Sequence, residues 1–212
     1  MMTFQNALTS FLQKYPSLAP CEASLVEAYH ILANCFAQSG KLLICGNGGS
    51  AADSEHIVGE LMKGFEKKRP LTDEQKAGFA AVADGEALAF RLQNTLPAIS
   101  LVSQTALLSA ISNDNGAEMV YAQQVWGYGQ RGDVLLALST SGYSENVLLA
   151  AKTAAVKGMS CIAITGEGGS PLSAIASLTI ALPAKGAREV QELTMPVYHF
   201  LCKCLEDSCF PI

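Results

Sequence analysis

The chain alternates between short apolar runs and stretches in which apolar residues recur every three or four positions. The apolar runs predict buried strands, and they lie at residues 41–45, 98–102, 133–138, 160–165 and 178–182. The three- and four-residue spacing predicts helices between these runs and over residues 1–40, where Pro16 and Pro20 interrupt the pattern. Strands that are apolar throughout are typical of sheets covered on both faces. The pattern therefore predicts an α/β three-layer sandwich around a five-stranded parallel sheet, preceded by an N-terminal helical segment.

One segment does not follow this alternation. Residues 66–96 begin with the charged run 66–70 and continue without a clear period. We interpret the segment as an insertion in a single domain that spans residues 1–212, and it is compatible with either a helix over 73–91 or a mobile loop. A final helix is predicted over residues 187–207, with a kink at Pro196 because proline removes one helix hydrogen bond.

Composition and charge limit the classes of partner. Half of the 212 residues are apolar and 16% are charged, which suits one folded core and excludes a disordered chain. No apolar run approaches the length of a membrane span and no basic leader precedes one, so we expect a cytoplasmic protein with no membrane partner. The net charge of −5 argues against nucleic acid as the main partner. A phosphate ligand is compatible with this charge, because one helix N-terminus can bind it.

The seven cysteines form no CxxC pair, and most lie in apolar runs. We therefore expect free, mostly buried thiols in a reducing compartment rather than disulfides or a zinc knuckle.

Two loops rich in small residues follow predicted strands. The second loop carries four hydroxyls in six residues before a helix, from Ser139, Thr140, Ser141 and Ser144. Hydroxyls beside the free N–H groups of a helix N-terminus are suited to bind phosphate. The alternative is that Ser141 or Ser144 only caps the helix, but a cap explains one hydroxyl and not four.

The first loop consists of Gly46, Asn47, Gly48, Gly49 and Ser50 after the strand at 41–45. Its glycines allow a ligand to approach the backbone closely, although a tight turn has the same composition. The loop matches neither the dinucleotide nor the nucleoside-triphosphate motif, so no nucleotide cofactor is expected. Both loops end parallel strands, where α/β proteins bind their ligands, and together they predict a phosphate site.

Histidine and glutamate side chains supply the candidate acid–base groups. His56 and Glu60 are one helical turn apart, so they share a face at a separation of about 6 Å, as exposed structural pairs also do. His199 lies on the last helix, about two turns after Gln191, and by itself has the surroundings of a core histidine. His30, in the N-terminal helices, is predicted to be structural.

Taken in order, these segments resemble the sugar isomerase (SIS) family and, within it, the phosphoheptose isomerases. The resemblance covers nearly the whole chain except residues 66–96. It rests on the two loops and on Asp53, His56, Glu60, Asn113, Asp114, Asn146, Gln191, Glu192 and His199. It implies the SIS fold, which is flavodoxin-like or Rossmann-like, and a homotetramer.

The resemblance also implies an activity, the isomerisation of a phosphosugar through an enediol. The expected reaction converts sedoheptulose 7-phosphate to D-glycero-D-manno/altro-heptose 7-phosphate, a precursor for lipopolysaccharide heptose. Glu60 is then the base at carbon and His199 the partner acid–base. Substrate-binding roles are implied for Asn47, Gly48, Gly49, Ser50, Asn113, Asp114, Ser139, Thr140, Ser141, Ser144 and Gln191.

Some family members bind zinc at positions that match His56, Glu60, Gln191 and His199. Two imidazoles, a carboxylate and an amide oxygen are acceptable zinc ligands, and the sequence leaves open whether metal is bound here. Two other functions are also open: a non-catalytic regulator like the replication-initiator-associating protein DiaA, and an isomerase of another phosphosugar.

Overall fold

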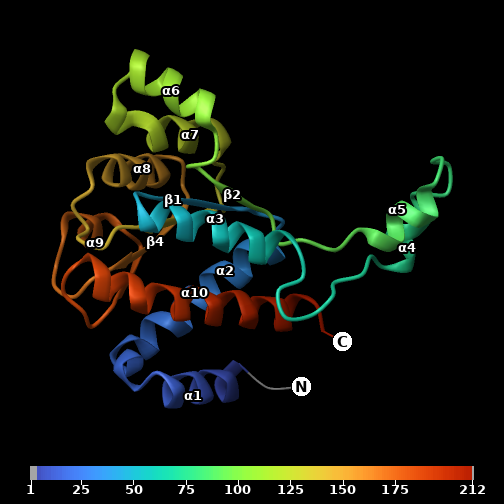
Figure 1. Ribbon diagram of the computed structural model, residues 1–212, viewed down its shortest axis with the longest axis horizontal. Helices are drawn as coiled ribbons and strands as arrows, with labels where there is room; N and C mark the ends of the chain where they lie inside the picture. Colours follow the sequence, from blue (N-terminus) through green and yellow to red (C-terminus); the bar gives the residue numbers. More distant parts are fainter. Residues whose placement is uncertain (1–3, 212) are drawn as a thin grey trace.

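The computed structural model describes residues 4–211 and places five strands in one parallel sheet (Figure 1). The strands run in the order β2-β1-β3-β4-β5 across the sheet. Their bounds are β1 Leu42–Gly46, β2 Ala98–Ser100, β3 Val134–Leu138, β4 Ser160–Thr165 and β5 Leu178–Ala181. All five predicted strands are confirmed.

Each central strand is apolar throughout because both of its faces are buried. In β1, Leu42 and Ile44 belong to the core on one side of the sheet, whereas Leu43 and Cys45 belong to the core on the other side. Successive strand residues point to opposite faces, so a sheet covered twice requires an unbroken apolar run.

Helices cover both faces and produce the predicted three layers. On one side lie α2 (Glu22–Ala37), α3 (Gly49–Met62) and α10 (Ala187–Cys209), and on the other lie α7 (Val120–Tyr128), α8 (Glu145–Val156) and α9 (Pro171–Ile175). The N-terminal helices are α1 (Phe4–Lys14), which packs against α10, and η1 (Pro16–Cys21), which packs against α2. On the other side of the sheet, α6 (Thr105–Asp114) and η2 (Ala117–Met119) pack beside α7. Figure 1 shows α1 beneath α10, where the rings of Phe11 and Phe200 stack with centroids 4.5 Å apart.

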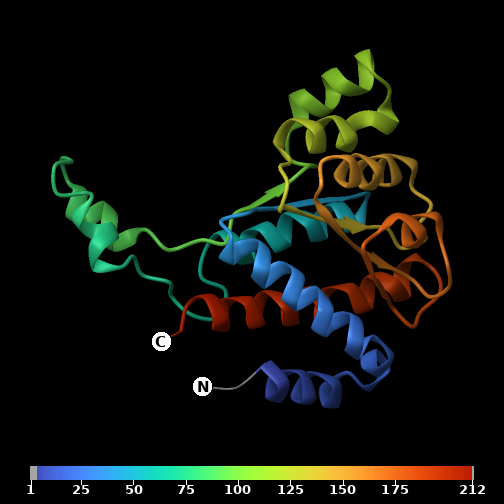
Figure 2. The same cartoon turned by 180° about the vertical axis from the view of Figure 1, so that it is seen from behind.

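The segment after α3 leaves the body as an arm, which both views show (Figures 1 and 2). It contains two short helices, α4 (Asp73–Ala77) and α5 (Gly85–Arg91), so a single helix over 73–91 is wrong. The chain turns between them, and Asp84 takes a left-handed φ of 56° there, which a continuous helix cannot contain.

The last helix, helix α9 and the cysteines can also be compared with the predictions made from the sequence. Helix α10 runs through Pro196 as one element. Helix α9 was not predicted, although Ser170 caps it and Pro171 is its first residue. The seven cysteines are free thiols and six of them are buried, as expected.

Among residues 4–211, no helix combines the length and the apolar character needed to cross a membrane.

Candidate functional site

The two predicted phosphate loops lie side by side, because each follows one of the neighbouring strands β1 and β3. The side-chain amides of Asn47 and Asn146 connect them through two reciprocal hydrogen bonds of 2.9 Å. Tyr121 on α7 donates its hydroxyl to the carbonyl of Gly46 at 2.6 Å. Burial raises the pKa of Tyr121 to about 12, so this hydroxyl stays protonated and keeps the first loop in place.

The second loop (residues 139–144, the serine loop) is stabilised by hydrogen bonds between its own residues. The hydroxyl of Ser139 accepts a hydrogen bond from the N–H of Gly142 at 3.1 Å and donates one to Ser144 at 3.2 Å. Ser144 occupies the cap position of α8, yet its side chain makes no capping hydrogen bond. Ser141 is exposed and Thr140 is half-buried. The capping alternative therefore fails for Ser144, and the loop presents hydroxyls beside a helix N-terminus, which suits a phosphate.

The glycines of the first loop serve two different purposes. Gly48 adopts a left-handed φ of 56°, which glycine tolerates best. Gly49 allows close packing, since a Cβ atom at this position would lie 2.5 Å from Nε2 of Gln191. Gln191 on α10 therefore reaches the first loop, as expected for a residue of the site. Ser50, the second residue of α3, is buried.

His56 and Glu60 share one face of α3, as their spacing predicts. Nε2 of His56 lies 3.0 Å from Oε1 of Glu60, and Nδ1 lies 2.9 Å from the hydroxyl of Tyr198. The same hydroxyl lies 3.3 Å from Oδ1 of Asp53. Burial, followed by the charge of Asp53, raises the pKa of Tyr198, so the hydroxyl stays protonated. The polar chain from Asp53 to Glu60 orients the His56 ring between two fixed partners.

His199 of α10 joins this group from the facing helix. Its ring meets that of His56 edge to face, with centroids 5.0 Å apart, and the ring of Phe65 lies 5.3 Å away on another side. Burial, and then the neighbouring His56, lower the pKa of His199, so a neutral imidazole is favoured. Within the described part of the chain, its Nε2 atom is buried without a hydrogen-bond partner. Buried polar atoms are normally paired, and the described residues supply no partner for this nitrogen.

Asn113 and Asp114 are the predicted site residues that lie apart from the others. They are exposed at the C-terminal end of α6, on the outer side of α7 (Figure 1). Their side chains bond to each other at 2.7 Å. Among residues 4–211, no hydrogen bond connects these two side chains to the loops or to the histidines.

The residues considered for zinc do not form a ligand cluster in this arrangement. Glu60 and His56 are bonded to each other, and Gln191 packs on Gly49. Over residues 4–211, no three His, Cys, Asp or Glu side chains are placed together so that they could hold a metal ion. The four residues as placed therefore do not fit a tetrahedral zinc ion, and we derive no step through metal.

Three residues of the site region were not identified from the sequence. Tyr121 and Tyr198 lie in helices that read as apolar stripes, and no local signal marks their hydroxyls. Arg69 belongs to a charged run that is typical of a solvated surface, but the structure buries it.

The fold and the site together define a phosphosugar-isomerase type of α/β protein, with phosphate loops beside a histidine–glutamate pair. The family model described as "SIS domain" matches residues 4–90 and 84–166. The phosphoheptose isomerase of Rhodospirillum rubrum is 35% identical over 204 residues, which cover 96% of this chain and 94% of the relative. The chain therefore belongs to the SIS domain family and, within it, to the phosphoheptose isomerases.

Solved structures agree with this assignment. The phosphoheptose isomerase from Francisella tularensis gives a TM-score of 0.76 at 27% identity, and the alignment covers 94% of each chain. The phosphoheptose isomerase from Neisseria gonorrhoeae gives a TM-score of 0.72 at 29% identity, with 94% of this chain and 96% of that chain covered. The predicted five-stranded SIS fold is thus confirmed.

Proposed function

We propose that this protein isomerises sedoheptulose 7-phosphate to D-glycero-D-manno/altro-heptose 7-phosphate through an enediol. Membership in the phosphoheptose isomerases supports this substrate. The single structural observation that carries the proposal is the meeting of His199 with the His56–Glu60 pair. Isomerisation through an enediol needs a base at carbon and a group that moves protons at the oxygens, and a carboxylate and an imidazole from two facing helices can supply both.

The phosphate end of the substrate binds to the serine loop. The exposed hydroxyl of Ser141 and the first N–H groups of α8 contact the phosphate oxygens, and the positive end of the helix dipole favours the negative charge. Asn47 and Gln191 contact the sugar from the first loop and from α10. The predicted contacts from Asn113 and Asp114 require either a movement of α6 or a site on another subunit.

The chemical step moves one proton between carbons and one between oxygens. Glu60 removes a proton from C1 of the ketose while His199, in its less populated protonated form, delivers a proton to the C2 oxygen, which gives the enediol. Glu60 then returns its proton to C2 and His199 takes the proton of the C1 hydroxyl, which forms the aldehyde. His56 holds Glu60 through its Nε2 contact, so the carboxylate keeps its orientation in both halves.

Zinc binding by His56, Glu60, Gln191 and His199 stays a prediction, and it requires these side chains to rearrange. Elemental analysis of protein purified without chelator, compared with the His56→Ala variant, tests it. Metal at less than about one-tenth of the protein concentration in the unaltered protein contradicts it.

A homotetramer and a cytoplasmic location are also proposals. The family resemblance supports the tetramer, and exposed apolar side chains on the arm, including Phe90 at 85% and Val82 at 51%, are compatible with contacts between copies. Light scattering on the purified protein measures the oligomer, and cell fractionation measures the location.

The decisive experiment measures turnover of sedoheptulose 7-phosphate by the purified protein. Glu60→Gln and His199→Ala are expected to lower kcat by at least about 100-fold while the sugar phosphate still binds. The control is His30→Ala. In the described part of the chain, the ring of His30 lies against the rings of Phe4 and Tyr29 in the N-terminal helices and not against His56 or His199. Tight binding without turnover in the unaltered protein contradicts the proposal and favours a sugar-phosphate-binding regulator, whereas turnover of a different phosphosugar changes only the substrate.

A further inference from the structure

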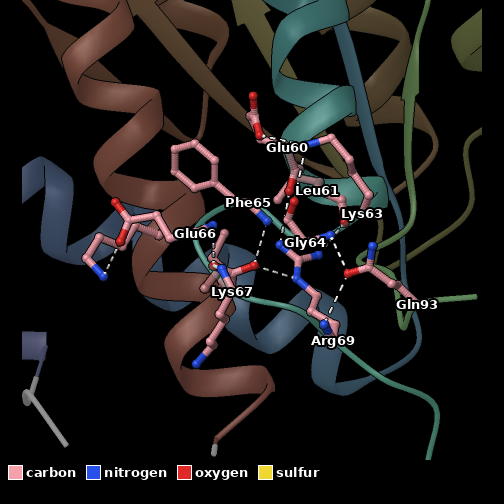
Figure 3. Close-up of polar contacts among 12 residues, drawn as sticks. Glu60, Leu61, Lys63, Gly64, Phe65, Glu66, Lys67, Arg69 and Gln93 are labelled. Atoms are coloured by element: carbon pink, nitrogen blue, oxygen red, sulfur yellow. Dashed lines mark hydrogen bonds and ion pairs between the residues drawn. The ribbon is translucent and has the colours of Figure 1, made fainter. Parts of the chain in front are cut away.

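Residues 65–69, which follow α3, are bound to the C-terminal part of α10 (Figure 3). The carboxylate of Glu206, which is 1% exposed, accepts hydrogen bonds from three consecutive backbone N–H groups. These are Phe65 at 2.8 Å, Glu66 at 2.9 Å and Lys67 at 3.3 Å. One buried side chain of α10 therefore sets the path of the chain directly after the helix that carries Glu60.

Arg69 connects Glu206 of α10 to the C-terminal end of α3. Its guanidinium is buried and donates to Oε1 of Glu206 at 2.7 Å, and it also donates to the carbonyls of Leu61 at 2.6 Å and Glu60 at 3.0 Å (Figure 3). Carbonyls in the last turn of a helix have no partner inside the helix. Arg69 satisfies two of them with its planar array of donors and places a positive charge at the negative end of the helix dipole.

Glu206 is ionised in this setting. Burial raises the pKa of its carboxyl, but the N–H groups of Phe65 and Glu66 and the side chain of Arg69 lower it further, so the net pKa lies below the ordinary value. A buried ion pair adds little net stability compared with apolar residues of the same volume. The pair is therefore better explained by the geometry that it imposes than by the free energy that it contributes.

The contacts of Arg69 and Glu206 join the two helices that carry the proposed acid–base residues, Glu60 on α3 and His199 on α10. Arg69 holds the backbone of Glu60 itself, and Glu206 lies on the same helix as His199, about two turns further along. Phe65, whose N–H is bound to Glu206, places its ring against His199. The base of the arm reinforces the connection, because Oε1 of Gln93 accepts from the N–H groups of Gly64 and Arg69.

We propose that Arg69 and Glu206 are positioning residues that hold the end of α3, and with it Glu60, at a fixed separation from His199 on α10. This inference rests on the proposed function, in which Glu60 and His199 act on the same substrate. A displacement of about 1 Å between catalytic groups is enough to lower a rate by about 100-fold.

The test compares three variants under the same assay. Arg69→Met/Glu206→Gln removes both charges and the bonds to the α3 carbonyls, while the glutamine oxygen can still accept from the backbone. Arg69→Lys keeps the charge but cannot reach both carbonyls with one planar group. The matched control is Asp207→Asn, which removes a neighbouring carboxylate that bonds to Lys67 and Lys203. Among residues 4–211, this carboxylate forms no hydrogen bond or ion pair with α3.

In the double variant kcat is expected to fall by about 100-fold with KM changed by less than about threefold, because the phosphate loops are untouched. Arg69→Lys is expected to fall between the double variant and the unaltered protein, and Asp207→Asn to stay within about twofold of it. A folded double variant with unaltered kcat overturns the proposal. So does a loss of kcat that is equally large in Asp207→Asn.

A second readout needs no substrate, so it separates this proposal from the proposed function. The chain has three histidines, and the imidazole NMR signals of His56 and His199 report their mutual placement, while His30 on α2 serves as the reference. The double variant is expected to shift the signals of His56 and His199 and to leave His30 in place. Unchanged signals overturn the positioning role even if the protein turns over no sugar phosphate.

Discussion

The hydroxyl of Tyr198 lies 2.9 Å from Nδ1 of His56, and this contact connects helix α10 to the histidine–glutamate pair of α3. Tyr198 is 2% exposed and precedes His199, so the same turn of α10 both orients His56 and supplies the second histidine. The site thus depends on how two helices face each other.

Tyr198→Phe tests this contact. Loss of the hydroxyl leaves Nδ1 of His56 and the carboxylate of Asp53 without a shared partner, so kcat is expected to fall by about 10-fold and the free energy of unfolding by about 1 kcal/mol. Steady-state kinetics and urea denaturation measure the two effects. Tyr128→Phe, at the end of α7, is the control and is expected to change neither quantity. Normal kcat in Tyr198→Phe would show that His56 needs no orientation from α10.

Gly49→Ala tests the close approach of Gln191 to the first loop. The new methyl group would lie 2.5 Å from Nε2 of Gln191, so the amide must move away and KM is expected to rise about 10-fold. The matched control is Gly59→Ala on the same helix, where a Cβ atom meets nothing within 4 Å. That change is expected to stabilise α3 by up to about 1 kcal/mol without altering KM. Equal KM values in both variants contradict the assigned contact.

The pKa of Glu206 predicts a change of stability with pH. Because this pKa is lower in the folded protein than the ordinary value of 4.5, the folded state binds the proton less readily than the unfolded chain. The carboxylate therefore contributes stability above pH 4.5, and the contribution is lost as the pH falls through the folded pKa. Urea denaturation between pH 7 and pH 3 should show a weaker acid loss in Glu206→Gln. An unchanged slope in that variant, with Asp73→Asn on the arm as the control, argues against this role.

Replacing residues 73–91 by a short Gly-Ser linker tests whether the body folds without the tip of the arm. The base of the arm is closed by the pairing of Pro70 with Gln93 and by the bond from the N–H of Asn94 to the carbonyl of Arg69 at 2.7 Å. These contacts are retained, so the free energy of unfolding is expected to change by less than about 1 kcal/mol. Calorimetry measures it. Unfolding of the shortened protein would mean that α4 and α5 contribute to the core.

The local features of this protein were determined by the sequence itself. Strands with both faces buried must be apolar throughout, so the apolar runs in the sequence predicted β1 and β3. The positions of the two loops could be predicted as well, because each loop comes directly after one of these strands. The His56–Glu60 contact was equally predictable, because helix geometry places residues four apart on one face. The break between α4 and α5 was not, since short helices in an exposed arm have weak apolar periodicity.

Tertiary structure decided which distant residues meet. The contacts of Gln191 with Gly49, of Tyr198 with His56 and of His199 with His56 depend on how α10 packs against α3, and no local period encodes that packing. Arg69 shows this most clearly. Its charged run is typical of a solvated surface, but a partner 137 residues away on the last helix neutralises it and allows it to be buried. Charge alone therefore did not determine burial, because the free energy of burying a charged group depends on the partner that the fold brings to it.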